Sequence, residues 1–591
     1  MLLKTGVLFM TINTEPTGDQ LENQEEVIDL SPSLTLDIKD EELVSTINRL
    51  VSEAETGRNE MIDKGELNEK YWKGNQLDET QLKDFQARIV DNRLFLSLET
   101  IIPIMTSRTP EPTIRMAAGE LRENTKQLLM NLWDVPTDDC STKGMQADFE
   151  QCSRHWSLYR IGALKYEYDP EINDIRTRVV RPQRLIFDKE GTTIDDSRFV
   201  AEYIEDTVEG LINKFPSKKS KILEKVGDKE HNLSKIRYLE FWTDDYVCYK
   251  YQDIILEKKK NPNWDYGDMG GEGTPKFNLF VKARKPYILL QVFNLGKQIY
   301  DDTSLFEQAI SLQDGLNKQK RQVSDITSDT GVLVGSGDFI EKKVLEAYTG
   351  DPKEKLFLKS GDARAALSRL EAKDLPPGIF NDINDTKSEI DNIFGSHSTT
   401  RGERAEPKTL GEAQLLRTGD LGRIDLFSRA LDRMAQEWFT SMLHMYLVFM
   451  TEPKTVNSND EDGTEIIFDR TKFIGQDGKL VKIKIKVKPG SAMSIDKDAR
   501  RAEAIQLASA KLIDPITLFE RLDYSNPREM AMKLFQWMTN PLDLFPELKA
   551  QVVAQQQAQQ QAETEMAANA PLPEGQPINI PTNLTAPSGV Q

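Results

Sequence analysis

The sequence is poor in the residues that usually build catalytic and metal centres. It contains three cysteines and four histidines among 591 residues. The cysteines are Cys140, Cys152 and Cys248. The histidines are His155, His231, His397 and His444. Because neither set has the spacing of a metal site, we expect reduced thiols, no metal and no cofactor.

Motifs for nucleotide chemistry and membrane insertion are absent as well. No G-x-x-x-x-G-K-[ST] segment occurs, which excludes a P-loop. The glycine-rich GVLVGSG of residues 331–337 lacks the lysine that would follow, so it predicts a strand or a hairpin turn. The most apolar run, Met442–Met450, is shorter than the roughly 18 residues of a membrane span. No small-residue cleavage site follows the initial MLLKTGVLFM, so we do not expect a signal peptide.

Positive charge is in deficit. Asp and Glu number 96 against 76 Lys and Arg, which gives a formal net charge of −20. A protein that holds DNA tightly through its phosphates would have an excess of the opposite sign. The balance argues against a tight nucleic-acid binder but permits a surface past which DNA slides. With 38% hydrophobic and 29% charged residues, the chain is globular and long enough for two or more folding units.

The sequence pattern of the first half of the chain predicts helices followed by strands. Residues 11–38 are polar and predict a loose segment. Apolar periodicity predicts helices over 41–72, 95–105 and parts of 120–160. Alternating side chains predict strands near 164–168, 175–180, 185–187, 236–242, 246–251 and 280–293. Residues 258–275 are rich in Gly and Pro and predict a long loop.

The most informative part of the sequence begins at residue 303. Ser304 lies three residues before Glu307, which is the spacing of a capping box, and apolar residues then recur at nearly helical intervals to Ile326. A second helix over 379–394 stops at Gly395, a residue type typical just past a helix C-terminus. About fifty mixed residues separate the two helices. The breaker-rich segment SHSTTRGERAEPKTLG (396–411) follows the second one.

The C-terminal part starts with a long helix. Glu412–Met450 has an apolar stripe and would span about 58 Å, although Gly419 and Gly422 allow a bend. The alternation in KIKIKVK (482–488) predicts a strand with four lysines on one face, joined to a partner by a hairpin turn at 476–478. Residues 497–540 are helical again. The tail from Gln551 begins with helix formers and ends in Pro/Asn/Thr-rich sequence that cannot bury a core.

Four further segments complete a resemblance to a known family. They are YWKGNQ (71–76), DNRLFLSLETIIPIMTSRTPEP (91–112), WSLYRIGALKYEYDPEINDIRTRVVRPQRLIFD (156–188) and RRAEAIQLASAKLIDPITLFERLDYSNPREM (500–530). Together with the order of helix, insert, helix, loop and long helix, they are similar to the portal proteins of tailed bacteriophages, of the podovirus type. The likeness covers roughly residues 40–540. It consists of segment order and loose motifs, without one invariant signature.

The resemblance implies an α+β, predominantly helical portal fold that assembles into a ring, usually of twelve copies. Implied for this chain are a flexible N-terminus (1–38), a wing (39–302), a first stem helix (303–328), a clip (329–377), a second stem helix (378–394), a tunnel loop (395–411), a long wing helix with a hairpin (412–490), crown helices (491–563) and a disordered tail (564–591). A ring of twelve copies would carry about −240 charges.

The implied function is a channel at a unique capsid vertex, through which terminase packages viral DNA and from which the DNA is ejected. The implied partners are further copies of the chain, the large terminase subunit, head–tail adaptor or tail proteins, the major capsid protein, scaffold and double-stranded DNA, without a membrane. The implied locations are the virion and, during assembly, the host cytoplasm. Low affinity suits a conduit, because each phosphate contact has to break as DNA advances. In the tunnel loop we expect His397, Arg401, Arg404 and Lys408 to face the DNA.

Two other classes of protein remain open. Another head–tail structural component of a phage would equally lack catalytic motifs, although the helix–clip–helix–loop–helix order is not expected in one. A DNA-processing enzyme, such as a nuclease or a terminase component, is disfavoured by the missing P-loop and the missing ligand clusters. We therefore expect no enzymatic activity.

Overall fold

The computed structural model divides the chain into two compact units, Met1–Ser494 and Ile495–Gln591. The residues that it describes are 38–78, 80, 82, 86–107, 109–116, 119–134, 144–227, 234–267, 276–328, 332–335, 341–346, 367–370, 374–396, 410–456, 466–487, 497–522, 524, 527–539, 554 and 557–560.

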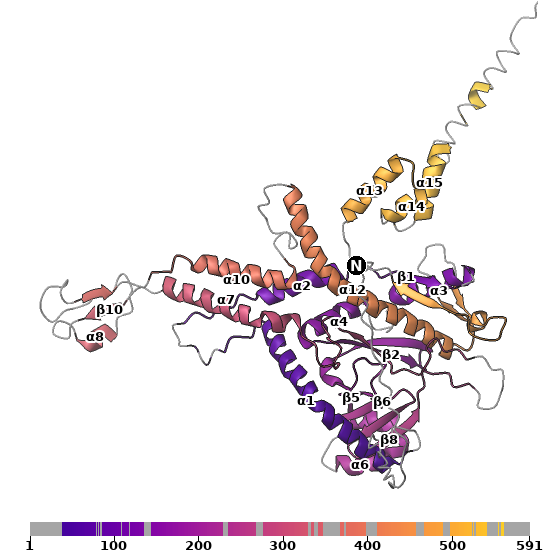
Figure 1. The fold of residues 1–591 in the computed structure, drawn as a ribbon, viewed down its shortest axis with the longest axis horizontal. Coiled ribbons are helices and arrows are strands. Elements are labelled where there is room, and N and C mark those ends of the chain that lie inside the picture. Colours follow the sequence, from indigo (N-terminus) through magenta and orange to yellow (C-terminus); the bar gives the residue numbers. More distant parts are fainter. Residues whose placement is uncertain are drawn as a thin grey trace, which may run out of the picture. The chain divides into compact units, whose positions relative to one another are not determined.

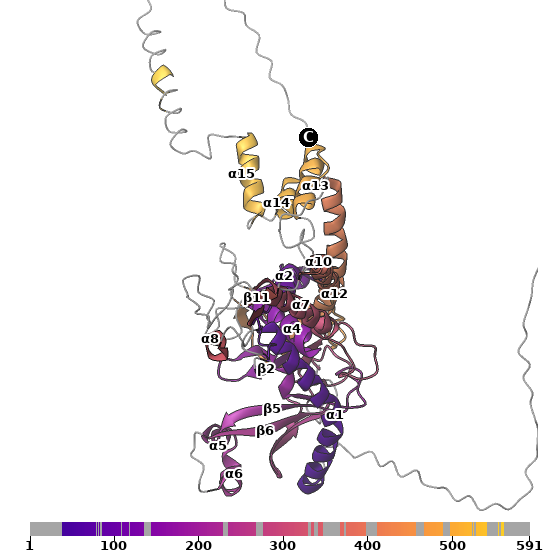
Figure 2. The same cartoon turned by 90° about the vertical axis from the view of Figure 1, so that its left-hand side faces the viewer.

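The first unit combines long helices with antiparallel sheets (Figure 1 and Figure 2). Its helices are α1 (Asp40–Trp72), α2 (Arg93–Met105), α3 (Gly119–Asp134), α4 (Met145–Tyr159), α5 (Val208–Lys214), α6 (Lys219–Val226), α7 (Leu305–Ser328), α8 (Lys342–Glu346), α10 (Ile379–Phe394) and α12 (Leu410–Phe449). Its strands are β1 (Pro112–Arg115), β2 (Gly162–Asp169), β3 (Asp174–Val180), β4 (Leu185–Phe187), β5 (Val200–Thr207), β6 (Lys235–Trp242), β7 (Tyr246–Tyr251), β8 (Ile254–Lys260), β9 (Tyr287–Leu290), β10 (Val332–Gly335), β11 (Leu367–Leu370), β12 (Lys454–Val456), β13 (Ile466–Phe468) and β14 (Lys484–Val487). The fold is therefore of the α+β class.

The second unit contains three described helices, α13 (Lys497–Ser509), α14 (Pro515–Arg521) and α15 (Pro527–Thr539). Asp514 caps α14, since its carboxylate accepts a hydrogen bond from the backbone N–H of Thr517. Among the described helices of both units, none is long and apolar enough to cross a membrane.

The largest sheet has the order β4-β5-β6-β7-β8, and each neighbouring pair is antiparallel. Apolar residues of α1 pack in one core cluster with Phe199, Phe241 and Tyr246 of the sheet region. The short helices α5 and α6 contribute to another cluster, with Tyr238 and Tyr251. Figure 2 shows α1 alongside β5 and β6, with α5 and α6 at the end of these strands. The sheet is thus held by helices that precede it and helices inserted within it.

A buried ion cluster joins this sheet to the smaller one, which has the order β3-β2-β9. Lys165 of β2 is 1% exposed, and its Nζ lies 2.5 Å from the Glu240 carboxylate of β6 and 3.6 Å from that of Glu202 of β5. Arg178 of β3 bonds both oxygens of Glu202 at 2.8 Å. Burial alone would lower the pKa of Lys165, but the two carboxylates raise it. Because each charge has a partner here, the cluster fixes which residues of the two sheets face each other.

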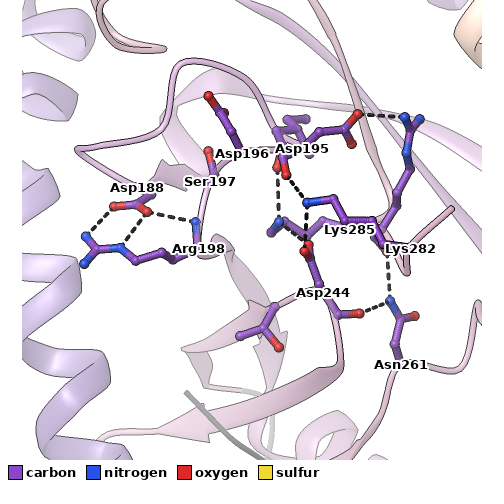
Figure 3. A network of polar contacts seen from close by, with 12 residues as sticks. Asp188, Asp195, Asp196, Ser197, Arg198, Asp244, Asn261, Lys282 and Lys285 are labelled. Carbon is purple, nitrogen blue, oxygen red and sulfur yellow. Dashed lines mark hydrogen bonds and ion pairs between the residues drawn. The ribbon is translucent and has the colours of Figure 1, made fainter. Parts of the chain in front are cut away.

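A polar network fastens the loop between β4 and β5 to the segment before β9 (Figure 3). Lys285 bonds the Asp244 carboxylate at 2.5 Å and the Ile194 carbonyl at 3.1 Å. Lys282 donates to the Asp195 carbonyl at 2.6 Å. At the other side of the loop, the guanidinium of Arg198 makes two hydrogen bonds to Asp188, of 2.8 and 2.7 Å. These bonds hold an extended connection that contains little regular structure of its own.

Most helices and strands predicted from the sequence are confirmed, and three details are wrong. The strand expected over 280–293 is limited to β9, because the flanking residues form bends tied down by side chains such as Lys285. The loop expected from 258 starts at 261, since β8 pairs with β7 as far as Lys260. The lysine-rich strand β14 pairs with β1, far away in the sequence, whereas the turn at 475–479 closes only an isolated bridge between Ile474 and Leu480.

We expect Gly65→Ala to destabilise the first unit. A Cβ at Gly65 would lie 1.9 Å from Cδ1 of Tyr159, whose ring would have to move and lose the 2.6 Å hydrogen bond from its hydroxyl to Glu69. Overpacking of this kind costs about 1–3 kcal/mol net of the gain in helix propensity, which lowers the midpoint of thermal unfolding by roughly 1–3 °C in a unit of this size. Gly57→Ala on the same helix is the control, because its Cβ would lie 3.2 Å from Tyr300. Equal midpoints for the two variants would contradict this account.

Candidate functional site: the α7–α10 helix pair

The α7 helix starts at a junction with α1 and α4. The Ser304 hydroxyl accepts from the backbone N–H of Glu307 at 3.1 Å, which confirms half of the predicted capping box. The other half is wrong, because the Glu307 carboxylate instead takes two hydrogen bonds, of 2.7 and 2.8 Å, from Arg160. Arg160 has a left-handed backbone with φ of 69°, which is uncommon for a residue with a side chain. Its paired guanidinium compensates for that strain and fixes the start of α7 on the end of α4.

The α7 and α10 helices form an antiparallel pair. Phe306 near the start of α7 packs edge-on against Phe394 at the end of α10, with ring centroids 6.0 Å apart. At the opposite end, Val323 and Thr327 line a shallow groove together with Phe380. The second helix ends at Gly395 with φ of 70°, which confirms the predicted left-handed cap. In Figure 1 the two helices lie side by side, and β10 and α8 of the intervening segment lie beyond their outer ends.

Two buried amides on α7 bind the loop that leads into α2. The Gln313 carbonyl oxygen accepts from the backbone N–H of Arg93 at 3.1 Å, and its amide donates to the Asp91 carbonyl at 2.5 Å. Asn317, one turn later, accepts from the backbone N–H of Asp91 at 2.9 Å. These polar residues are fully buried, whereas Leu312 of the predicted apolar stripe is half-buried. Side-chain amides thus replace apolar contacts at the centre of this interface.

An ion pair completes the joint between α2, α7 and α10. Arg93 bonds the Asp391 carboxylate through Nε at 3.0 Å and through Nη2 at 2.6 Å, with side chains 12% and 7% exposed. Asp91 lies 2.5 Å from the ammonium of Lys320 on α7 and 3.5 Å from that of Lys387 on α10. Burial acts to raise the pKa of Asp91, but hydrogen bonding and charge from these two lysines lower it overall. None of these contacts was predicted from the sequence, where the one local signal is the presence of amides among the apolar positions of α7.

The exposed face of α10 carries carboxylates at helical spacing. Asp382, Asp385 and Glu389 are three and four residues apart and exposed, so they lie along one side of the helix. Asn381, Asn384 and Ser388 are exposed beside them. The sequence of α10 contains one lysine, Lys387, and its ammonium lies near the carboxylate of Asp91. The outer surface of α10 is therefore acidic and polar.

The predicted DNA-facing residues His397, Arg401, Arg404 and Lys408 lie outside the described residues, so their role stays a prediction. Both ends of the segment that contains them are described, Ser396 after α10 and Leu410 at the start of α12. Arg423 of α12 donates to the backbone carbonyl of Asn392 on α10, close to these ends. Within the described part of the chain, no group of three or more His, Cys, Asp or Glu side chains is placed to bind a metal ion.

We expect Asp391→Asn or Arg93→Met alone to cost about 3 kcal/mol, because each leaves a buried charge without its partner. The double variant R93M/D391L should recover most of that loss, since two apolar side chains replace both charges. The midpoint of thermal unfolding, measured for the wild type, both single variants and the double variant, gives the coupling between the two residues. Strictly additive losses would show that the pair does not hold α10 to α2.

Comparisons with known proteins address the same region. The model of the phage P22-like portal protein family matches residues 283–577. A solved chain from the neck of an empty GTA particle is 11% identical with a TM-score of 0.35, over 73% of this chain and 90% of that chain; this likeness is too slight to carry an argument. No match was found among curated proteins. The family match spans β9, α7, α10, α12 and the described helices of the second unit, and the chain belongs to the phage P22-like portal protein family.

Proposed function

We propose that the chain assembles into a ring at a single capsid vertex and forms the channel through which terminase packages viral DNA and from which the DNA later leaves. The observation that carries this proposal is the family match over residues 283–577, which contains α7, α10, α12 and the segment between α10 and α12. In this proposal 303–328 and 378–394 are the stem helices, 329–377 is the clip, and 395–411 is the tunnel loop. Residues 39–302 form the wing, 412–490 add its long helix and hairpin, and 491–563 form the crown.

The electrostatics of α10 support a passive conduit. Asp382, Asp385 and Glu389 present carboxylates along the exposed side of this helix, in a chain whose net charge is −20. If that side faces the channel, the wall repels DNA phosphates and leaves few contacts to break as the DNA moves. The stem itself has to stay rigid while DNA passes, and the paired groups around Arg93, Asp391 and Gln313 provide that rigidity.

The partners follow from the channel role. Terminase binds the clip during packaging, and a head–tail adaptor or tail protein takes that place afterwards. Because the sequence has no P-loop, the energy for translocation comes from the terminase. The major capsid protein and scaffold are further partners in this proposal. The protein acts without catalysis, in the virion and, before that, in the host cytoplasm.

We expect the purified full-length chain to form closed rings with an open centre. Twelve copies of the 67.3 kDa chain give a particle of about 800 kDa. End-on particle images together with native mass spectrometry measure the copy number. Monomers under every salt and concentration condition would count against the portal proposal, as would DNA cleavage in an assay with DNA, Mg²⁺ and ATP.

We propose that the cations of the tunnel loop touch the DNA backbone transiently. Neutralising them in R401Q/R404Q/K408Q should reduce packaged genome length or genome retention, measured by an in vitro packaging assay with nuclease protection. The control K219Q/K221Q/K225Q removes three positive charges from α6, a helix of the wing region, and should package as the wild type does. Equal packaging by both triple variants would contradict a role for the loop.

A further inference from the structure

One charged feature of the sequence has no place in the channel proposal, namely the lysines of the KIKIKVK segment. In the structure β14 pairs antiparallel with β1, which is separated from it in the sequence by most of the first unit. The two strands form a sheet of their own, and we call it the basic ribbon. Ile114, Ile485 and Val487 are buried on one face, where β14 packs against α12 and β1 against α3. Figure 1 shows β1 and α3 beside α12, away from α7 and α10.

The other face of the basic ribbon carries cations at regular spacing. Lys484 and Lys486 alternate with the buried residues of β14 and are exposed. Arg115, exposed on β1, lies directly opposite Lys484 in the register. Lys482 is exposed two residues before Lys484. None of these four cations has an ion-pair partner among the residues that the structure describes. A patch of four positive charges is thus concentrated on a chain whose total charge is −20.

This arrangement is unfavourable for the isolated protein. Like charges directly opposite each other in an antiparallel pair are destabilising, and Arg115 and Lys484 are such a pair. Lysines on a narrow sheet protect its edges against pairing with other chains, but that protection does not require charges of one sign in register. A polyanion bound along the ribbon would remove the repulsion between the cations. The cost in the free protein therefore indicates a negatively charged ligand.

The spacing of the cations fits a linear phosphate backbone. Residues on the same face of a strand are about 6.7 Å apart, which matches the rise of two base pairs along the axis of a DNA duplex. Within the described strands, no aromatic side chain lies among these cations, so base stacking and base readout are not available. The ribbon therefore favours contact with phosphates independent of sequence.

We propose that the exposed face of the basic ribbon, made of Arg115, Lys482, Lys484 and Lys486, is a second DNA-contact site, which binds the phosphate backbone of double-stranded DNA without sequence preference. The site is separate from the tunnel loop. The choice of DNA over other linear polyanions rests on the proposed channel function, since that function brings duplex DNA to the protein. The binding measurement itself does not require channel activity.

The test compares DNA binding by the wild type, K482Q/K484Q/K486Q and the charge-matched control K219Q/K221Q/K225Q. The probe is a fluorescent random-sequence duplex, and fluorescence anisotropy is recorded from 50 to 300 mM NaCl. Each lost phosphate contact lowers the slope of log affinity against log salt by about 0.9, so the ribbon variant should lose about 2.7 from the slope and at least tenfold in affinity at low salt. The control should bind within about threefold of the wild type.

Two further measurements separate the outcomes. The ribbon variant should unfold at the same temperature as the wild type or slightly higher, because it loses the Arg115–Lys484 repulsion. End-on images of the same samples show whether rings form, and this tests the proposed function separately. If the wild type forms no rings but its DNA binding depends on the ribbon lysines, the inference of a DNA-contact site is supported on its own. It is overturned if the ribbon variant and the control bind DNA equally, or if poly-glutamate of equal charge binds the ribbon tenfold more tightly than DNA and identifies an acidic protein partner.

Discussion

The bond between Arg93 and Asp391 is the constraint on which the arrangement of the helix pair depends. The two residues are 298 positions apart in the sequence, and their side chains are almost entirely removed from water. A buried charge without its partner costs several kcal/mol, so α2 and α10 are held in the one arrangement that satisfies both groups. Gln313 and Asn317 act in the same way between α7 and the start of α2. Directional bonds, together with apolar packing such as that of Phe306 on Phe394, therefore determine how these three helices meet.

The same principle applies elsewhere in the first unit. Lys165, Glu202 and Glu240 fix one sheet against the other, and Lys285 with Asp244 fixes the segment that leads to β9. Apolar packing tolerates small shifts of register, whereas a buried ion pair does not. In the proposed channel, buried ion pairs of this kind would keep the subunit rigid while DNA passes. The buried charges are thus explained by rigidity, without assigning them any catalytic task.

Local features of the fold could be predicted from the sequence, and long-range pairings could not. The Ser304 cap, the Gly395 cap and the length of α12 all follow from spacing rules that act within one or two helical turns. The pairing of β14 with β1 joins residues more than 350 positions apart. The alternating side chains of β14 predict a half-buried strand, but they do not predict which strand pairs with it. Glu307 illustrates the limit most clearly. Its spacing suits a capping box, but the guanidinium of Arg160 binds the carboxylate more strongly than a backbone N–H does. The sequence does not show that Arg160 lies next to Glu307 in the fold.

The distribution of charge separates the surfaces of this portal protein into two kinds. The exposed side of α10 is acidic, as the whole chain is, and a surface of that sign repels phosphates. The basic ribbon has the opposite sign, and in the described structure its cations lack the acidic partners that surround Arg93, Lys165 and Lys285. The buried cations Arg93, Lys165 and Lys285 are paired with carboxylates that hold the fold together, while those of the ribbon are exposed at a cost to stability. Such a cost to stability is retained where it serves binding, because a bound polyanion supplies the negative charges that the described neighbours of the ribbon do not supply.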